Sequence, residues 1–261
     1  MIDGKRIKIE FEPLTTISYN YPNSLKKTVL GILWRNTLYR NLHDSPIQKL
    51  ISVSYIHSDD RIKFQKSGID FGKKAYFYVS SPVPEFINHI EKFLTKKRKV
   101  FIEEKHPLIN IEEVNPPEIN PNCNKFKLKT TPVHAQVADS TRKEYIPLQP
   151  NHPYYTTLLI NNLERKISLI TGKPFNLKDK ITFTYRPGKN GNYKVKTFTF
   201  KSSSNKEYIV RAFILNNLKI VFKNTTPEEK RLILETLYYS GIGAKNSHGF
   251  GFVYSIKGEE K

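Results

Sequence analysis

The chain has 261 residues, and its 43 Lys and Arg side chains against 24 Asp and Glu give a net charge of +19. Hydrophobic residues make up 38% of the sequence, which is enough for a packed core and argues against disorder along the whole chain. A single cysteine, Cys123, excludes an internal disulfide and every metal or redox motif built on paired cysteines. No apolar run approaches the ~18 residues of a membrane span and no signal-peptide core is present, so we expect a soluble cytoplasmic protein.

The excess of positive charge favours a polyanionic partner. The densest run of basic residues is 96–99, and Lys125, Lys127 and Lys129 alternate, which places them on one face of a strand. Each run alone is typical of a solvated surface. The whole excess, however, favours nucleic acid over an acidic membrane surface, because no basic amphipathic helix is present.

The first part of the chain predicts a β-α-β-β-α-β order. Charged and apolar side chains alternate over 6–11, which indicates a half-buried strand. A helix is expected from Asn23 and Ser24 to near His43, because Pro46 disfavours helix in the residue before it. The elements expected next are strands at 50–56 and 75–79, a helix at 84–93 and a strand that begins at Val100. This is the order of a ferredoxin-like unit.

Prolines and asparagines between 114 and 124 predict a linker, with one domain at 1–113 and another at 125–261. Helices are expected at 154–170 and after the Thr226 cap. The strands expected in this second domain are 126–130, 181–185, 193–200, 208–215, 219–222 and 250–256. A second ferredoxin-like unit with an extra hairpin accounts for this order, so the predicted fold class is α+β with two tandem ferredoxin-like (βαββαβ) domains.

The most specific segment is the glycine-rich loop at 241–251, GIGAKNSHGFG. It is not a Walker loop, because it lacks the Gly-Lys-Ser/Thr sequence. It is not a dinucleotide-binding fingerprint either, because that motif follows a strand and precedes a helix, whereas this loop follows a helix and precedes a strand. A helix cap would need one glycine, whereas this loop has four. Positions without side chains let the backbone approach a ligand closely, and successive amides can bind an anion.

This GxGxxNSxGFG pattern resembles the carboxy-terminal loop of the repeat-associated RNA-binding proteins of CRISPR systems, in particular the Cas-six family of endoribonucleases that mature guide RNA. The resemblance also takes in the segments 8–11, 30–33, 49–54 and 131–133. It implies that the loop binds RNA. The loop residues expected to do so are Gly241, Gly243, Lys245, Asn246, Ser247, His248, Gly249 and Gly251. For His248, a solvent-facing loop side chain is the alternative.

Members of that family carry a histidine at the end of the first helix and a lysine before the next strand, which match His43 and Lys49. The resemblance implies metal-independent scission, in which the ribose 2′-hydroxyl attacks the adjacent phosphorus and leaves a 2′,3′-cyclic phosphate and a 5′-hydroxyl. His43 would be the general base or acid, and a helix C-terminus favours its imidazolium form. Lys49 would stabilise the developing negative charge.

The tyrosine that often completes this family's site has no direct counterpart, because Trp34 stands where it is expected. Tyr39 lies four residues before His43, and Arg35 lies one turn earlier. We expect a polar stripe of Arg35, Tyr39 and His43 that faces the cleft, with Tyr39 catalytic and Arg35 in contact with RNA. Core packing or simple exposure is the alternative for Tyr39.

No HExxH motif, carboxylate cluster or Cys/His spacing is present, so no metal or cofactor is expected. The partners expected are CRISPR repeat RNA, both precursor and mature guide, with other effector subunits and a second copy of the chain as further candidates. Two other functions stay open at this point. One is a catalytically inactive RNA-binding subunit of a CRISPR effector complex, and the other is a nucleic-acid-binding protein unrelated to these systems.

Overall fold

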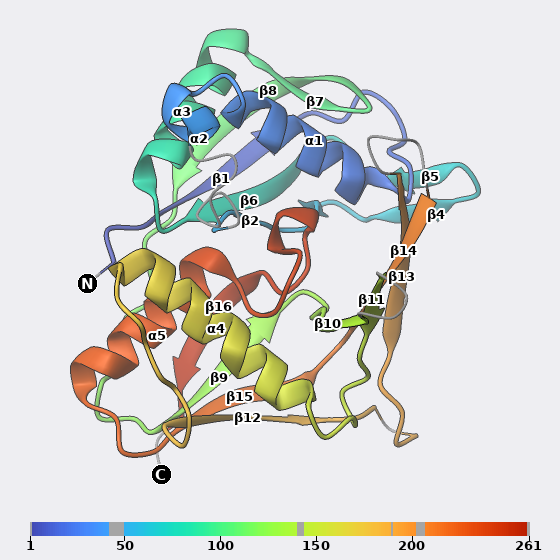
Figure 1. Cartoon of the computed structure of the whole chain (residues 1–261). Coiled ribbons are helices and arrows are strands. Elements are labelled where there is room, and N and C mark those ends of the chain that lie inside the picture. Colours follow the sequence, from blue (N-terminus) through green and yellow to red (C-terminus); the bar gives the residue numbers. More distant parts are fainter. Residues whose placement is uncertain (1, 42–49, 140–143, 189, 202–206, 260–261) are drawn as a thin grey trace. The chain divides into compact units, whose positions relative to one another are not determined.

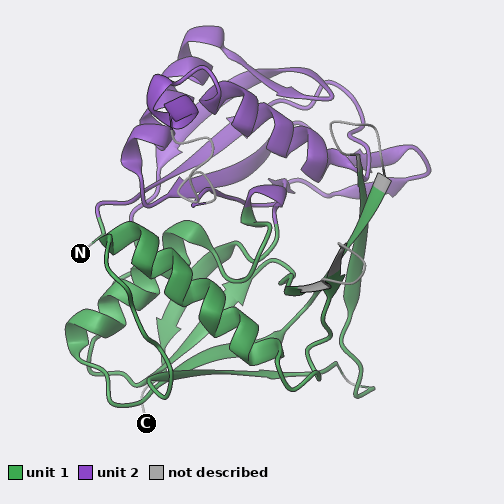
Figure 2. Cartoon of the chain, in the orientation of Figure 1, with its two compact units in different colours: residues 1–2, 116–246, 250–261 green, residues 3–115, 247–249 purple. Residues whose placement is uncertain are grey.

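The computed structural model describes residues 2–41, 50–139, 144–188, 190–201 and 207–259 (Figure 1). They form two compact units (Figure 2). The N-terminal unit comprises residues 3–115 and 247–249, and the C-terminal unit comprises 116–246 and 250–259 together with Ile2. The chain passes from one unit to the other between Asn115 and Pro116, inside the stretch expected to be a linker. None of the described helices is long and apolar enough to cross a membrane.

The N-terminal unit is a ferredoxin-like fold built on one antiparallel sheet, with strand order β2-β6-β1-β8-β7. Its sheet strands are β1 (Lys5–Phe11), β2 (Ser52–Val53), β6 (Ala75–Ser81), β7 (Lys99–Ile102) and β8 (Glu104–Glu113). Its helices are α1 (Tyr21–Leu33), α2 (Thr37–Asn41) and α3 (Pro84–Lys97). Short β3 (His57–Ser58) also pairs with β6, and β4 (Lys63–Gln65) pairs with β5 (Gly68–Asp70) as a separate hairpin.

Apolar periodicity explains how the elements of this unit pack. Ile7, Ile9 and Phe11 alternate along β1 and are fully buried. Phe86 and Ile90, four residues apart on α3, are buried in the same core. The strands expected at 6–11 and 75–79 and the helix expected at 84–93 are therefore confirmed, although α3 continues to Lys97.

The single helix expected from Asn23 to His43 is wrong. The helix α1 ends at Leu33, where the Asn36 amide donates to the Leu33 carbonyl (2.8 Å) and tightens the last turn. The Asn36 side chain then accepts a hydrogen bond from the Tyr39 amide (3.0 Å) and caps the short helix α2. A side chain that favours a cap over a helix interior thus interrupts the predicted helix.

Two expected strands of this unit also differ from the structure. The segment 50–56 forms a strand only at β2, Ser52–Val53. The strand that begins at Lys99 is β7, but it does not close the sheet against β1. Instead Glu103, at φ +63°, turns the chain into β8, and β8 pairs with β1. Because Glu103 adopts a left-handed conformation that is unusual for a non-glycine residue, sequence patterning alone gave no signal for this turn.

The C-terminal unit repeats the same topology, with strand order β12-β15-β9-β16. Its sheet strands are β9 (Lys125–Thr130), β12 (Ile181–Arg186), β15 (Asn216–Phe222) and β16 (Val253–Gly258). Its helices are α4 (Tyr155–Thr171) and α5 (Pro227–Ser240). Between α5 and β16 the chain forms the 3₁₀ turn η2 (Asn246–His248), whose last two residues belong to the N-terminal unit. The expected extra hairpin is β13 (Val195–Lys201) with β14 (Glu207–Phe213), and a second hairpin, β10 (Gln136–Asp139) with β11 (Glu144–Pro147), was not expected.

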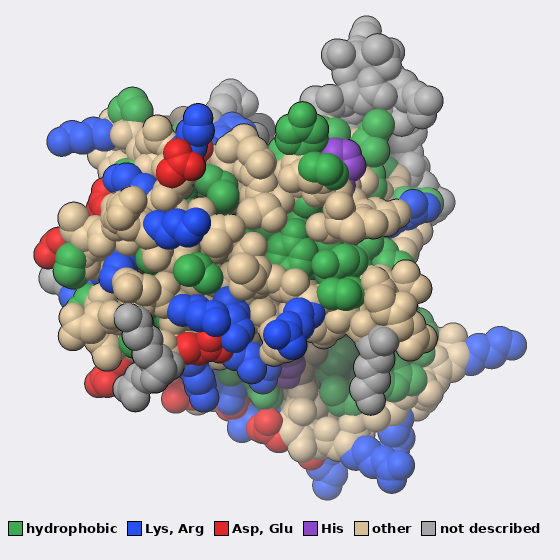
Figure 3. Space-filling view, turned by 90° about the horizontal axis from the view of Figure 1, so that it is seen from below, with side chains coloured by type: hydrophobic (Ala, Val, Ile, Leu, Met, Phe, Trp, Pro, Cys, Tyr) green, Lys and Arg blue, Asp and Glu red, His purple; other side chains and the backbone are tan. Residues whose placement is uncertain are grey.

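The alternating lysines of β9 share one face, as predicted. Lys125, Lys127 and Lys129 are exposed, whereas the residues between them are buried. Glu259 pairs with Lys125 (3.4 Å) and with Lys219 of the neighbouring strand β15 (2.7 Å). Figure 3 shows one face of the molecule, on which Lys and Arg side chains are dispersed among hydrophobic and neutral ones and outnumber the acidic ones.

Candidate nucleic-acid interface

The glycine-rich loop begins where α5 ends. The helix starts with a capping box, in which Thr226 accepts from the Glu229 amide and the Glu229 side chain accepts from the Thr226 amide. It ends at Gly241, which has φ +74° and donates its amide to the Leu237 carbonyl (2.9 Å). The four loop glycines all have positive φ. The loop therefore needs more glycines than a single helix cap, as the sequence predicted.

Close approach of backbone to backbone explains two of these glycines. A Cβ on Gly243 would lie 2.5 Å from the His134 carbonyl oxygen, and one on Gly251 would collide with the Ile242 carbonyl oxygen. The loop is also hydrogen-bonded to its neighbours, because the Ala244 amide donates to the His134 carbonyl (2.9 Å). Any side chain at these positions would therefore displace backbone rather than a flexible side-chain end.

The segment 131–133, which the family resemblance included, holds the other end of the loop. The Phe252 amide donates to Thr131 Oγ1 (2.8 Å), and the Thr131 amide donates to the Phe252 carbonyl (3.0 Å). The Gly251 amide donates to the Pro132 carbonyl (2.8 Å). These bonds join the end of the loop to the chain that follows β9, so this end of the loop is fixed within the C-terminal unit.

A buried lysine of α4 holds the glycine-rich loop through hydrogen bonds to its oxygen atoms. Lys166 of α4 is 7% exposed, and its ammonium is surrounded by loop oxygens. Its Nζ donates to the carbonyl oxygens of Ser240 (3.0 Å), Gly241 (2.7 Å) and Gly243 (3.2 Å) and to Asn246 Oδ1 (2.8 Å). Burial lowers the pKa of Lys166 to about 7, whereas four oxygen acceptors favour its charged form.

Sequence reasoning missed Lys166, although a signal was present. Leu159, Leu163 and Ile167 form the buried stripe of α4, and Lys166 falls on the same side of the helix. A lysine on the apolar stripe of an amphipathic helix must find buried acceptors or extend to solvent. Here it finds the carbonyl groups of the glycine-rich loop, and it therefore acts as a positioning residue for that loop.

Asn246 is also buried, and its side chain bonds to other residues of the loop instead of facing solvent. Its side chain is 4% exposed, and Nδ2 donates to the carbonyl oxygens of Ile242 (3.1 Å) and Phe250 (2.8 Å). With Oδ1 bound to Lys166, both polar atoms of this side chain are occupied within the unit. The expectation that the Asn246 side chain contacts RNA does not fit this geometry, and we assign it to holding the loop closed.

Lys245 is the cation that the loop presents beside an aromatic ring. Its backbone is left-handed, with φ +58°, and its Nζ lies 5.2 Å from the centre of the Tyr208 ring on β14. Burial lowers the pKa of Lys245. A cation–π pair next to a close-packed glycine backbone is a combination that suits a phosphate with an adjacent base.

A small cavity of about 240 Å³ lies beside the loop in the same unit. His134, Asn162, Arg165, Gly243 and Ala244 contribute to its lining. Burial lowers the pKa of His134, and both ring nitrogens are hydrogen-bonded, to the Arg211 carbonyl (2.6 Å) and to Gln136 Oε1 (2.8 Å). Among the described residues, the buried Asn162 Oδ1 has no hydrogen-bond partner.

Residues 247–249, at the tip of the loop, belong to the N-terminal unit. His248 is 7% exposed, and its Nε2 lies 2.9 Å from Lys26 Nζ of α1. Because an ammonium can only donate, this contact fits a neutral imidazole whose Nε2 accepts. The solvent-facing alternative for His248 is therefore wrong. Gly249, at φ +89°, packs so closely on Tyr55 that a Cβ would lie 2.7 Å from its ring.

The expected polar stripe near the first helix is not formed as predicted. Tyr39 is 3% exposed and packs edge-to-face on Phe86 (5.3 Å between ring centres), and burial raises its pKa. Arg35 is exposed and lies over the Phe93 ring (5.0 Å). The break between α1 and α2 separates the two residues, which is why they share no helical face. His43 and Lys49 lie outside the described residues.

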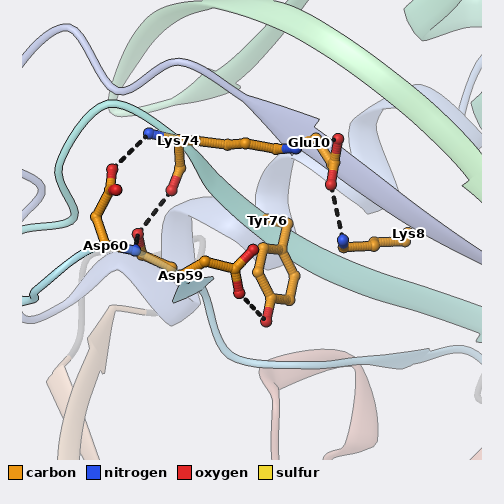
Figure 4. Close-up of polar contacts among 7 residues, drawn as sticks. Lys8, Glu10, Asp59, Asp60, Lys74 and Tyr76 are labelled. Atoms are coloured by element: carbon orange, nitrogen blue, oxygen red, sulfur yellow. Dashed lines mark hydrogen bonds and ion pairs between the residues drawn. The ribbon is translucent and has the colours of Figure 1, made fainter.

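The face of the N-terminal sheet opposite its core carries charges that neutralise one another (Figure 4). Glu10 accepts from Lys8 (2.7 Å) and pairs with Lys74 (2.9 Å). Burial raises the pKa of Glu10, but the hydrogen bonds from the two lysines outweigh it and hold the pKa below its ordinary value. Lys8 also lies 4.3 Å from the centre of the Tyr76 ring, on which His57 stacks.

No group of three or more His, Cys, Asp and Glu able to hold a metal ion occurs within the part of the chain that the structure describes. Because His43 lies outside the described residues, metal independence stays a prediction.

Comparison with known proteins identifies relatives over the whole chain. The family model described as "CRISPR associated protein Cas6, C-terminal" matches residues 114–254. A CRISPR-associated endoribonuclease Cas6 from Methanocaldococcus jannaschii is 26% identical over 268 residues, covering 98% of this chain and 95% of the relative. Among solved structures, the product of a Cas6-related gene from Pyrococcus furiosus aligns with a TM-score of 0.77 at 19% identity over 98% of this chain and all of that one. A protein described as a RAMP protein binding different RNA substrates aligns with a TM-score of 0.76 at 18% identity over the same shares.

Proposed function

The chain belongs to the Cas6 family of CRISPR-associated proteins, and on that premise we propose that it is an endoribonuclease that cuts CRISPR repeat RNA to guide RNA. The observation that carries the proposal is the glycine-rich loop. Its glycines are required by backbone packing, and its carbonyls are held by the buried Lys166. A fixed loop in which Lys245 and Ser247 keep partly exposed side chains suits close contact with a polyanion.

The proposed reaction needs neither metal nor cofactor. The ribose 2′-hydroxyl attacks the adjacent phosphorus, the bond to the 5′-oxygen of the next nucleotide breaks, and a 2′,3′-cyclic phosphate and a 5′-hydroxyl remain. Because the nucleophile is already tethered, the enzyme aligns it, moves protons and stabilises charge. His43 takes or supplies the proton, and Lys49 stabilises the charge that develops on the phosphoryl oxygens.

The loop residues divide into two proposed roles. The partly exposed cation of Lys245 approaches the RNA, and RNA contacts of the buried Gly241, Gly243 and Gly251 stay predictions from the sequence. Asn246 and Lys166 hold that backbone in place from inside the unit. Ser247, His248 and Gly249 stay proposed RNA contacts, although the His248 ring is already bound to Lys26.

One assay tests the reaction. Repeat RNA is incubated with the protein in EDTA, alongside the same RNA with a single 2′-deoxy substitution at the cut site. We expect cutting of the first and not of the second, with a cyclic phosphate on the upstream product. Loss of cutting in EDTA, or equal cutting of the deoxy substrate, would refute the proposed chemistry.

One observation favours a second candidate, a catalytically inactive RNA-binding subunit of a CRISPR effector complex. Trp34 occupies the place expected for the family's tyrosine, and Tyr39, the substitute predicted from the sequence, is buried in the core. Binding of repeat RNA with no cutting in the same assay would support this candidate. Contacts with other effector subunits or with a second copy of the chain stay predictions from the sequence.

A further inference from the structure

An open groove of about 850 Å³ runs along the N-terminal unit between α1, α3 and the β7–β8 hairpin. It lies within this one unit and involves no residue of the glycine-rich loop. Five cationic side chains line it, namely Lys27, Arg35, Lys97, Lys99 and Lys105, and Glu103 is the one acidic residue in the lining. A groove with this excess of positive charge attracts a polyanion.

The cations of this groove are available to a ligand. Within the described residues, none of the five forms an ion pair with a carboxylate, in contrast to Lys8 and Lys74, which share Glu10. Glu103 is engaged elsewhere, because its carboxylate accepts from both the backbone amide and the hydroxyl of Ser18. All five cationic residues are exposed, so a phosphate can reach them without any rearrangement of the fold.

Two aromatic side chains, Phe93 and Phe101, line the groove together with these cations. Phe101 of β7 is 53% exposed, although large apolar side chains are usually buried. Phe93 of α3 carries the Arg35 guanidinium over its ring at 5.0 Å. Gly31 of α1 also lines the groove and leaves space open there, because a Cβ at this position would meet no atom within 4 Å.

We propose that this groove binds a single-stranded segment of RNA, with the cations on phosphates and Phe101 stacked on a base. A purely electrostatic partner would not require exposed rings, whereas single strands combine a charged backbone with bases that stack on aromatic side chains. The inference rests on the proposed function in that the polyanion is RNA. It adds a binding site that contains no residue of the glycine-rich loop, and it has no need of a defined sequence.

The test is binding of a 5′-fluorescein-labelled single-stranded RNA of about 12 nucleotides without repeat sequence, measured by fluorescence anisotropy. The variant Lys99→Glu/Lys105→Glu should bind this RNA about tenfold or more weakly, and its affinity should depend less on salt. Lys66→Glu/Lys92→Glu is the matched control, because it makes the same charge change at exposed residues of the same unit outside the groove. The control should bind within about twofold of the wild type.

Two further variants keep the test independent of folding defects. Phe101→Ala should weaken binding about fivefold or more through lost stacking without a change in charge. Gly31→Glu places a carboxylate in the groove without removing any contact, since its Cβ has open space. Unchanged affinity in these variants, or an equal loss in the control pair, would overturn the groove as a binding site.

The outcome can be separated from that of the proposed endoribonuclease. Cutting of repeat RNA is measured in the same variants under saturating, single-turnover conditions, where we expect a rate close to that of the wild type. A wild-type protein that fails to cut, while the groove variants still lose single-strand binding, overturns the nuclease and supports the groove. A wild type that cuts, with groove variants that bind normally, overturns the groove alone.

Discussion

Replacement of Gly243 by alanine tests whether the glycine-rich loop is held by backbone contact. Two costs add at this position. The left-handed conformation, at φ +71°, costs an alanine about 1–2 kcal/mol. Its Cβ would also lie 2.5 Å from the His134 carbonyl oxygen, and relief of such overpacking costs about 1–3 kcal/mol because backbone must move.

Gly172 provides a matched control at the end of α4. Its φ of +68° is nearly the same, but a Cβ there would meet nothing within 4 Å. We therefore expect Gly172→Ala to lower the free energy of unfolding by about 1–2 kcal/mol and Gly243→Ala by about 2–5 kcal/mol, measured by urea denaturation. RNA affinity, measured by anisotropy, should fall in Gly243→Ala only.

Equal destabilisation by the two alanines would refute the argument from close contact. An unchanged RNA affinity in Gly243→Ala, with the expected loss of stability, would mean that the loop is a structural element and does not bind RNA. The two measurements together therefore separate the packing of the loop from its function.

Three further outcomes follow from the described contacts. Lys166→Met should lower the free energy of unfolding by about 2–4 kcal/mol in urea denaturation, because four buried oxygens lose their donor; a change below about 0.5 kcal/mol would contradict its role. Because the pKa of Lys166 falls from 10.5 to about 7 on folding, the unfolded chain binds its proton more tightly, so wild-type stability should rise relative to Lys166→Met between about pH 7 and about pH 10. Absence of that difference in urea titrations would show that the ammonium is held fully charged. Tyr39→Phe should change the cutting rate less than about threefold, since Tyr39 packs on Phe86, whereas a hundredfold loss would restore its catalytic interpretation.

The order of the elements could be predicted because strand and helix periodicities are local properties of the sequence. The Thr226 cap and the alternating lysines of β9 were both read from a few adjacent residues, and the structure confirms them. The turn at Glu103 and the break after Leu33 were missed. Each depends on one residue in a conformation or a cap that apolar patterning does not report.

The candidate site was less predictable, because it depends on which side chains are buried by the fold. The sequence pattern predicted that Asn246 and His248 contact RNA, whereas both residues are buried in the structure. Lys166 lies 75 residues before Gly241 in the chain, so only the packing of α4 beside α5 brings its ammonium to that loop. Local sequence patterns cannot reveal which residues such a lysine contacts, although a lysine on the apolar stripe of a helix indicates that it needs buried acceptors or a path to solvent.

The most direct test of the central claim is the single-turnover rate of repeat-RNA cutting by His43→Ala, measured together with its RNA affinity. His152→Ala, which changes an exposed histidine of the C-terminal unit, is the control. We predict that His43→Ala loses cutting by about a hundredfold or more while its affinity stays within about threefold of the wild type, and that the control does neither. Cutting at the wild-type rate by His43→Ala would contradict the account.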